Sequence, residues 1–167
     1  MSQYFWPVPK WEMQYSYCER PRAFGSPRDG GNRKHAGCDL YAPLGSPVVA
    51  VCHGWVIRVY EFYGKADAIE VNHGAHGIIR YGEVDVLPGI GAGTLVPAGT
   101  QIAKVAQLVG FGNIHPMLHF ELYSGKATGK LTQAIGEYKR RSDLLDPTSF
   151  LDKLRPWATV ERTFAFA

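Results

Sequence analysis

Residues 116–123 read Pro-Met-Leu-His-Phe-Glu-Leu-Tyr and carry the most regular pattern in the chain. Successive side chains of a β-strand point to opposite faces, so a strand here would present two different surfaces. One surface would carry Met117, His119, Glu121 and Tyr123, and the other Leu118, Phe120 and Leu122. The pattern therefore predicts a strand with one apolar face and one face that bears a histidine and a carboxylate.

Shorter apolar runs separated by turn residues surround this segment. They lie at 48–51, 55–59, 68–72, 78–84 and 101–109. Short strands separated by turns at roughly 8–12-residue intervals indicate an all-β fold with a mainly antiparallel sheet or sandwich. Near the C-terminus, Asp146-Pro147 is typical of a helix start and predicts a short helix over Thr148–Leu154.

The composition fits a single folded domain. The chain has 167 residues, and 46% of them are hydrophobic, which is enough for a core. Its 18 Lys and Arg against 15 Asp and Glu give a net charge of +3, and no basic cluster indicates nucleic-acid binding. No apolar run approaches the roughly 20 residues of a membrane span, so we expect no transmembrane segment.

The cysteines and the first residues bear on whether the protein has disulfides and a secretory leader. Cys18, Cys38 and Cys52 are an odd number without CxxC spacing, so no disulfide framework is expected, although one bridge with a free thiol stays open. The chain starts MSQYFWPVPKWEMQ, which lacks the apolar region of a Sec-type secretory leader.

Three residues have the chemistry of a metal site. His35 and Asp39 lie four positions apart, and His119 occupies the strand quoted above. Two imidazoles and one carboxylate form a zinc ligand set that leaves the fourth position open for water. The residues alone leave surface histidines, or histidines with ordinary hydrogen-bond partners, as the alternative.

The stretch from Phe24 to Tyr123 resembles the lysostaphin-like, or LytM-type, zinc peptidases, which are peptidoglycan endopeptidases with a duplicated hybrid motif. The matching segments, in chain order, are Phe24-Gly25 with Arg28, His35-Ala-Gly-Cys-Asp39-Leu40, Ala42-Pro-Leu-Gly-Ser-Pro-Val-Val-Ala50 with Gly54, His73-Gly74 with Tyr81, Val96-x-x-Gly99-x-x-Ile102, Leu118-His119-Phe120-Glu121 and Asp146-Pro147. The irregular, Pro- and aromatic-rich start of the chain predicts an arm over residues 1–23 that packs over another part of the protein, and the end predicts a loose tail over 157–167. The resemblance implies a zinc peptidase domain over 24–156.

This resemblance also implies the site. It assigns one zinc ion per chain to a groove in an antiparallel sheet, with His35, Asp39 and His119 as ligands. The family has two further histidines that assist catalysis, and here Met117 and Glu83 stand at those positions. The chain therefore resembles a subtype that lacks both usual helper histidines.

The missing helpers leave three interpretations open. In the first, the enzyme is active, and Glu83 acts as general base towards zinc-bound water, with His115 as a second candidate. In the second, the domain is a degenerate enzyme that binds zinc and a cell-wall peptide or a partner protein, since Met117 cannot move protons. In the third, the chemistry differs, for example carboxypeptidase instead of endopeptidase cleavage.

Other residues are assigned to the groove and to the ligands' surroundings. Tyr81 and Met117 are expected to line the substrate groove together with His76, although Tyr81 could equally be a core aromatic. Glu121 shares a strand face with His119 and is expected either to hydrogen-bond the second nitrogen of that ligand or to pair with a surface cation.

The resemblance implies a substrate outside the cytoplasm. We expect the protein to act on peptidoglycan peptides in the periplasm or the extracellular cell wall. Without a recognisable leader, delivery would need another secretion route or lysis, which would suit an antibacterial effector or a phage lysis enzyme. An inhibitor or immunity protein is then a possible partner, and nucleic acid is not.

Overall fold

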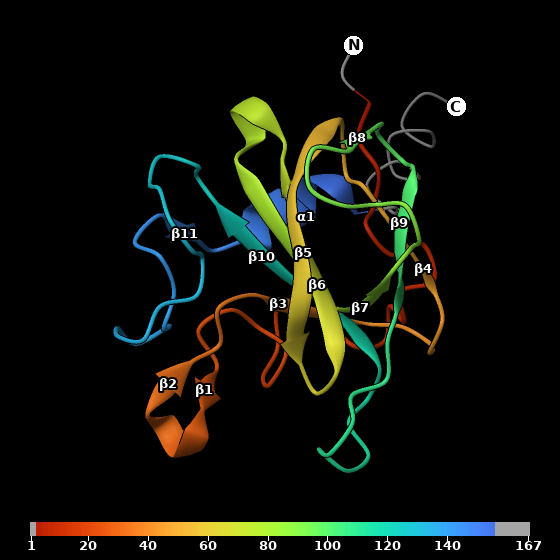
Figure 1. The fold of residues 1–167 in the computed structure, drawn as a ribbon. Helices are drawn as coiled ribbons and strands as arrows, with labels where there is room; N and C mark the ends of the chain where they lie inside the picture. Colours follow the sequence, from red (N-terminus) through yellow and green to blue (C-terminus); the bar gives the residue numbers. More distant parts are fainter. Residues whose placement is uncertain (1–2, 156–167) are drawn as a thin grey trace, which may run out of the picture.

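A computed structural model describes residues 3–155 of the chain. Antiparallel strands are its main regular secondary structure (Figure 1). The elements in chain order are β1 (Pro27–Arg28), η1 (Asp29–Gly31), β2 (Arg33–Lys34), β3 (Cys38–Tyr41), β4 (Pro47–Val49), β5 (Gly54–Tyr63), β6 (Ala66–Asn72), η2 (Gly74–His76), β7 (Ile78–Val86), β8 (Leu95–Val96), β9 (Gln101–Val105), β10 (Met117–Tyr123), β11 (Leu144–Leu145) and α1 (Thr148–Leu154). The predicted all-β antiparallel fold with a short C-terminal helix is confirmed.

The central sheet has the strand order β11-β10-β7-β6-β5-β8. In addition, β3 pairs with β10, and β9 pairs with both β4 and β7. The predicted strand over 101–109 ends earlier than expected, at Val105. The predicted helix has the expected bounds, with Asp146 Oδ1 accepting a hydrogen bond of 2.9 Å from the Thr148 amide before its first turn.

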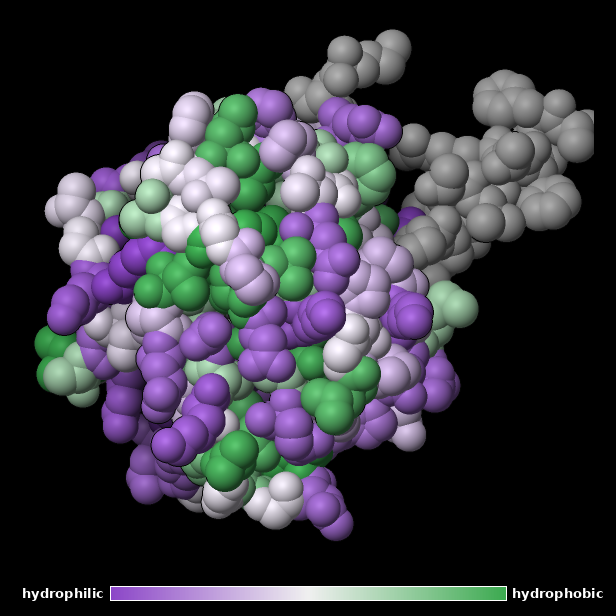
Figure 2. Space-filling model, turned by 45° about the vertical axis from the view of Figure 1, so that its right-hand side comes forward, coloured by the Kyte–Doolittle hydropathy of each residue, from purple (hydrophilic) through white to green (hydrophobic). Residues whose placement is uncertain are grey.

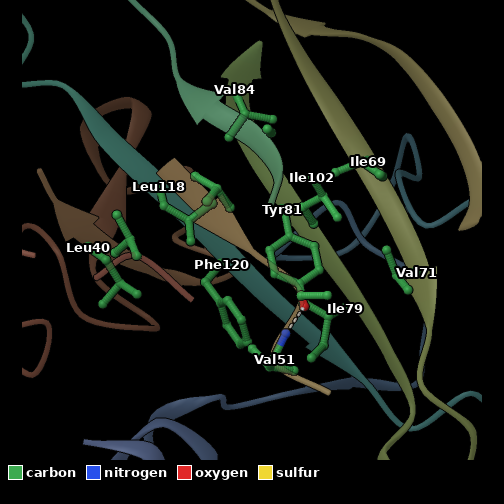
Figure 3. Close-up of a cluster of buried hydrophobic side chains, with 14 of the residues drawn as sticks. Leu40, Val51, Ile69, Val71, Ile79, Tyr81, Val84, Ile102, Leu118 and Phe120 are labelled. Carbon is green, nitrogen blue, oxygen red and sulfur yellow. Dashed lines mark hydrogen bonds between the residues drawn. The ribbon is translucent and has the colours of Figure 1, made fainter. Parts of the chain in front are cut away.

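The alternation in β10 separates a core face from a polar face. Phe120 and Leu118 join Tyr81, Ile69 and Val71 in the main buried cluster (Figure 3). Helix α1 lies behind the sheet in Figure 1, and its Phe150 ring stacks on the Phe120 ring with centroids 6.2 Å apart. His119 and Glu121 point to the opposite face, which carries the site described below.

The segment predicted as an arm is part of the same core. Trp6, Val8, Trp11 and Tyr17 are buried in the main cluster together with strand residues. The aromatic rings contact one another, with the Trp6 and Trp11 centroids 4.9 Å apart. Residues 3–23 therefore pack against the sheet, and the predicted tail over 157–167 lies outside the described residues.

The described surface has scattered apolar groups, and the cysteines form no disulfide. Apolar side chains occur in small groups between hydrophilic ones on the face drawn in Figure 2. Cys38 and Cys52 are buried, Cys18 is exposed, and all three are free. None of the helices within residues 3–155 has the length and apolarity needed to cross a bilayer.

Gly37 allows β3 to approach β10 closely. A Cβ atom added at this position would lie 2.9 Å from the carbonyl carbon of Phe120, nearer still to its oxygen, and 3.1 Å from Cε1 of His119. The obstructing atoms are mainly backbone, so a larger side chain cannot be accommodated by a rotamer change. This steric restriction explains why position 37, between His35 and Asp39, requires glycine.

We expect Gly37→Ala to destabilise the protein by about 3 kcal/mol, towards the upper end of overpacking effects, because β3 must separate from β10. Urea unfolding followed by circular dichroism measures this change. Gly91→Ala is the matched control: a Cβ there meets no atom within 4 Å. It should change stability by less than about 0.5 kcal/mol. Equal stability of the two variants would contradict the steric role of Gly37.

Candidate metal centre

Three side chains far apart in the sequence meet at one point on the polar face of the sheet. His35 Nε2 lies 3.0 Å from Asp39 Oδ1 and 3.1 Å from His119 Nδ1, and His119 Nδ1 lies 2.9 Å from Asp39 Oδ1. The three residues are buried, with exposed fractions of 3%, 6% and 6% in chain order. Asp39 and His119 are direct partners in the β3–β10 ladder, so the strand register brings the second and third ligands together.

The outer nitrogens of both imidazoles are held by hydrogen-bond acceptors. His35 Nδ1 lies 2.9 Å from the Ala23 carbonyl oxygen, and His119 Nε2 lies 2.9 Å from Glu121 Oε1. In neutral rings these nitrogens carry the proton, which leaves lone pairs on His35 Nε2 and His119 Nδ1. Together with Asp39 Oδ1, three lone pairs then face one another, an arrangement that needs a cation or a proton between them.

The triangle of donor atoms fits zinc. Zinc bonds of 2.0–2.1 Å in a tetrahedron place neighbouring ligand atoms about 3.3 Å apart. The observed separations of 2.9, 3.0 and 3.1 Å are shorter by only a few tenths of an ångström. Two imidazoles and a carboxylate are also the ligand types of catalytic zinc sites with one open position.

The guanidinium of Arg28 orients the Asp39 carboxylate. Arg28 Nη2 lies 3.3 Å from Asp39 Oδ2, so Oδ1 is the oxygen that faces the histidines. Burial alone would raise the pKa of Asp39, but the charges and hydrogen bonds of His35 and His119 outweigh it and hold that pKa below its usual value. The carboxylate is therefore ionised when a metal arrives.

The pKa values of the two histidines are shifted in opposite directions. Burial lowers the pKa of His119, but hydrogen bonds with the Asp39 and Glu121 carboxylates outweigh it and raise that pKa to about 9. Burial is also the largest influence on His35, and there it lowers the pKa. In the metal-free protein a single extra proton on His119 therefore relieves the repulsion of the lone pairs, and a bound cation would replace it.

Residues 33–131 match peptidase family M23. The chain belongs to this family. The match includes all three candidate ligands, and it confirms the resemblance to LytM-type and lysostaphin-like peptidases. Membership of the family supports a hydrolase that cleaves peptidoglycan.

Three solved structures show the same fold. The catalytic domain of the antimicrobial peptidase lysostaphin from Staphylococcus simulans is 21% identical, with a TM-score of 0.57 over 77% of this chain and 88% of that one. LytU is 24% identical, with a TM-score of 0.57 over 83% and 90%. A zinc-containing peptidase from Vibrio cholerae is 25% identical, with a TM-score of 0.56 over 77% and 41%. A search of curated protein sequences finds no significant match.

Glu83 occupies a β-bulge in this M23 chain. Gly82 pairs with Ala68 and Val84 pairs with Asp67, so Glu83 is the extra residue of β7. Its φ of 62° lies in the left-handed region, which is strained for a residue with a side chain. Gly82 is also the ladder partner of His119 in β10, so the bulge lies directly beside the third candidate ligand.

The environment of Glu83 raises its pKa to about 7. Burial is the main cause, and the charge of His119 acts in the opposite direction. A carboxyl group with a pKa near neutrality can both accept and donate a proton under physiological conditions.

Met117 lies two residues before His119 on the same strand and pairs with Tyr41 of β3. It is 7% exposed. A thioether cannot donate a hydrogen bond and is a poor partner for Zn²⁺, so Met117 presents an apolar surface beside the candidate ligands.

The structure does not bring His115 to the three ligands. Its Nε2 lies 2.6 Å from Glu12 Oε2, and its ring stacks on Tyr41 with centroids 4.3 Å apart. It lies four positions before His119 and outside β10, which begins at Met117. Reaching the site would require His115 to leave both partners.

Tyr81 and His76 also lie away from the site. Tyr81 is fully buried on the core face, where its hydroxyl accepts a hydrogen bond of 3.1 Å from the Val51 amide (Figure 3) and contacts His73 Nε2 at 3.0 Å. His76 belongs to η2, before the first residue of β7, and its Nε2 lies 2.8 Å from the Tyr4 hydroxyl. The expectation that these two side chains line the groove is therefore corrected.

The N-terminal segment contributes to the site through its backbone, which the sequence could not reveal. Carbonyl groups of Pro21–Ala23 accept hydrogen bonds from Arg28 Nη2, the Asp39 amide and His35 Nδ1, at 2.8, 3.0 and 2.9 Å respectively. Every residue has a carbonyl, so no residue type marks this role. Only the position of the segment beside β3 creates it.

We expect purified protein to contain about one zinc per chain, and His119→Ala to contain far less, because three ligands are the minimum for a catalytic zinc site. Elemental analysis measures the content, and circular dichroism checks the fold. His76→Ala, which changes an exposed histidine away from the site, should keep its zinc. Full zinc retention in His119→Ala would contradict the ligand assignment.

Proposed function

We propose that the chain is a zinc-dependent peptidase that cleaves a peptide bond in peptidoglycan stem peptides or cross-links. The observation that supports this most is the meeting of three lone pairs from His35, Asp39 and His119, each ligand being fixed by a second partner. A zinc ion held there supplies a Lewis acid and a bound water of lowered pKa.

Glu83 is the proposed proton acceptor. It lies in a bulge beside the ladder partner of His119, and bulges of this kind often redirect a side chain at an active site. Burial brings the pKa of Glu83 to about 7, so a proton taken from water can be passed to a leaving amine. Arg28 keeps Asp39 oriented during this exchange and takes no proton itself.

A catalytically degenerate domain is the second candidate. The position two residues before His119 carries Met117, which has no proton to give and no hydrogen bond to donate to a developing oxyanion. In this alternative the protein would bind zinc and a wall peptide or a partner protein without cleaving it.

Incubation with purified muropeptides, with and without a chelator, followed by mass spectrometry, distinguishes the two candidates. Chelator-sensitive cleavage supports the peptidase, and the product masses identify the bond, including a carboxypeptidase cut. Zinc binding with no cleavage of any wall fragment would favour the degenerate domain.

Members of family M23 act on the cell wall, so we place the substrate in the periplasm or outside the cell.

We expect Glu83→Gln to retain zinc and fold while turnover falls by roughly 10²–10⁴, the usual contribution of general acid–base catalysis. Initial rates on a muropeptide measure this. Glu83→Gly separates strain from chemistry: it should be as inactive as Glu83→Gln but more stable, since glycine adopts a φ of 62° without strain. Unchanged turnover in Glu83→Gln would assign the proton transfer to another group.

Met117→His should fold with little loss of stability, because the resemblance to LytM-type peptidases implies a histidine on this strand face. In an enzyme that already uses Glu83, the added imidazole should bring little gain and could compete for the metal. In a degenerate domain, Met117→His combined with Glu83→His should create or raise hydrolysis. Activity in this double variant together with none in the native protein would overturn the proposed native activity.

A further inference from the structure

Four charged residues form one straight row across the polar face of the sheet. They are Glu121 on β10, Arg80 on β7, Glu70 on β6 and Arg58 on β5, and each is the direct ladder partner of the next. Their closest N–O distances along the row are 2.8, 3.3 and 2.9 Å. We call these four residues the charged row.

Three of the four members are removed from solvent. The side chains of Arg80 and Glu121 are 0% exposed and that of Glu70 is 2% exposed, whereas that of Arg58 is 33% exposed. Burying such charges costs several kcal/mol per ion, and well-packed apolar residues often stabilise a protein as well or better. Within residues 3–155, the Arg80 Nε also has no hydrogen-bond partner. The stability of the sheet therefore gives no sufficient reason for this row.

The row ends on a candidate zinc ligand. Glu121 Oε1 lies 2.9 Å from His119 Nε2 and 2.9 Å from Arg140 Nε. Its other oxygen accepts hydrogen bonds from Arg80 Nη1, at 2.8 Å, and from the Tyr123 hydroxyl. Both oxygens of the carboxylate are thus held, and the group cannot rotate away from the imidazole without breaking charged hydrogen bonds.

Arg80 itself is fixed between several partners. Its Nη2 lies 3.3 Å from Glu70 Oε1 and 2.9 Å from Thr132 Oγ1. The Phe62 ring lies over its guanidinium at 4.9 Å and also stacks against His119, with centroids 6.1 Å apart. Phe62 thereby shields both groups from water, and a hydrogen bond shielded in this way is stronger than one in solvent.

We propose that Arg80 is a positioning residue for the metal centre: acting through Glu121, it fixes the tautomer and orientation of His119 and so sets the affinity for zinc. This inference rests on the proposed zinc site. Without Arg80, Glu121 Oε2 loses its charged donor and keeps only the Tyr123 hydroxyl, so the carboxylate that accepts from His119 Nε2 is held less firmly. The imidazole would then present its Nδ1 lone pair to the metal for only part of the time.

The test compares zinc affinities of folded variants by competition with a chromophoric chelator. Partners that bind a metal ligand directly are worth 10–100-fold in metal affinity, and Arg80 acts one residue further away. We therefore expect Arg80→Met to weaken zinc binding about tenfold. Arg141→Met is the matched control, because Arg141 forms a comparable, little-exposed ion pair with Asp143 at 2.7 Å. Its side chain hydrogen-bonds Asp143 and the Gly129 carbonyl instead of Glu121.

The control separates positioning from stability. Both arginine variants should lose stability in urea, but only Arg80→Met should lose zinc affinity and change the visible spectrum of the Co²⁺-substituted protein. If Arg80→Met does not fold, Glu70→Gln preserves side-chain shape, removes one charge from the row and should weaken zinc binding at least threefold.

Two negative outcomes have different meanings. Equal zinc affinities of the native protein, Arg80→Met (or Glu70→Gln, where it is used) and Arg141→Met would overturn the positioning role while leaving the zinc site intact. A native protein that binds no zinc would instead overturn the proposed function. Neither outcome depends on measuring peptidase activity.

Discussion

The close pairing of β3 with β10 is the constraint on which the rest of the structure depends. It places Asp39 directly opposite His119, although 80 residues separate them in the chain. The pairing is possible only because Gly37 has no side chain where the Phe120 backbone passes. The same strand β10 contributes Phe120 to the core and His119 to the site, so packing on one face and ligand geometry on the other are set by a single register.

The candidate metal centre brings together three side-chain lone pairs, which is unfavourable unless a cation or a proton lies between them. Three lone pairs within 3.1 Å of one another repel, and only a proton or a metal relieves this. Each ligand is held in place from behind, His35 by the Ala23 carbonyl, Asp39 by Arg28 and His119 by Glu121. These outer contacts offset the repulsion among the three ligand atoms. Both the N-terminal segment and the charged row therefore stabilise the same small cluster.

The sequence predicted what depends on local pattern and on the type of residue. Alternation predicted β10 and Asp146-Pro147 predicted α1. The residue types alone left the metal site open, and the resemblance to LytM-type peptidases implied the three candidate ligands. The sequence could not predict contacts that depend on register, such as the row from Glu121 to Arg58, because lone charged residues in strands resemble surface positions until their neighbours are known. The same limit explains Tyr81, whose side-chain type fits both a groove and a core, and whose buried position only the sheet decides.

Met117 and Glu83, the two positions where the resemblance implies histidines, differ in their backbone environment beside His119. Met117 lies on the regular part of β10, where a side chain can change without moving the backbone. Glu83 lies in a bulge with a left-handed φ of 62°, and such strain persists only where the surroundings enforce it. A bulge with glycine at this position would relieve that strain, and a neutral side chain would avoid burying a carboxylate. The strained backbone and the raised pKa of Glu83 are therefore the two features that support its proposed role as proton acceptor.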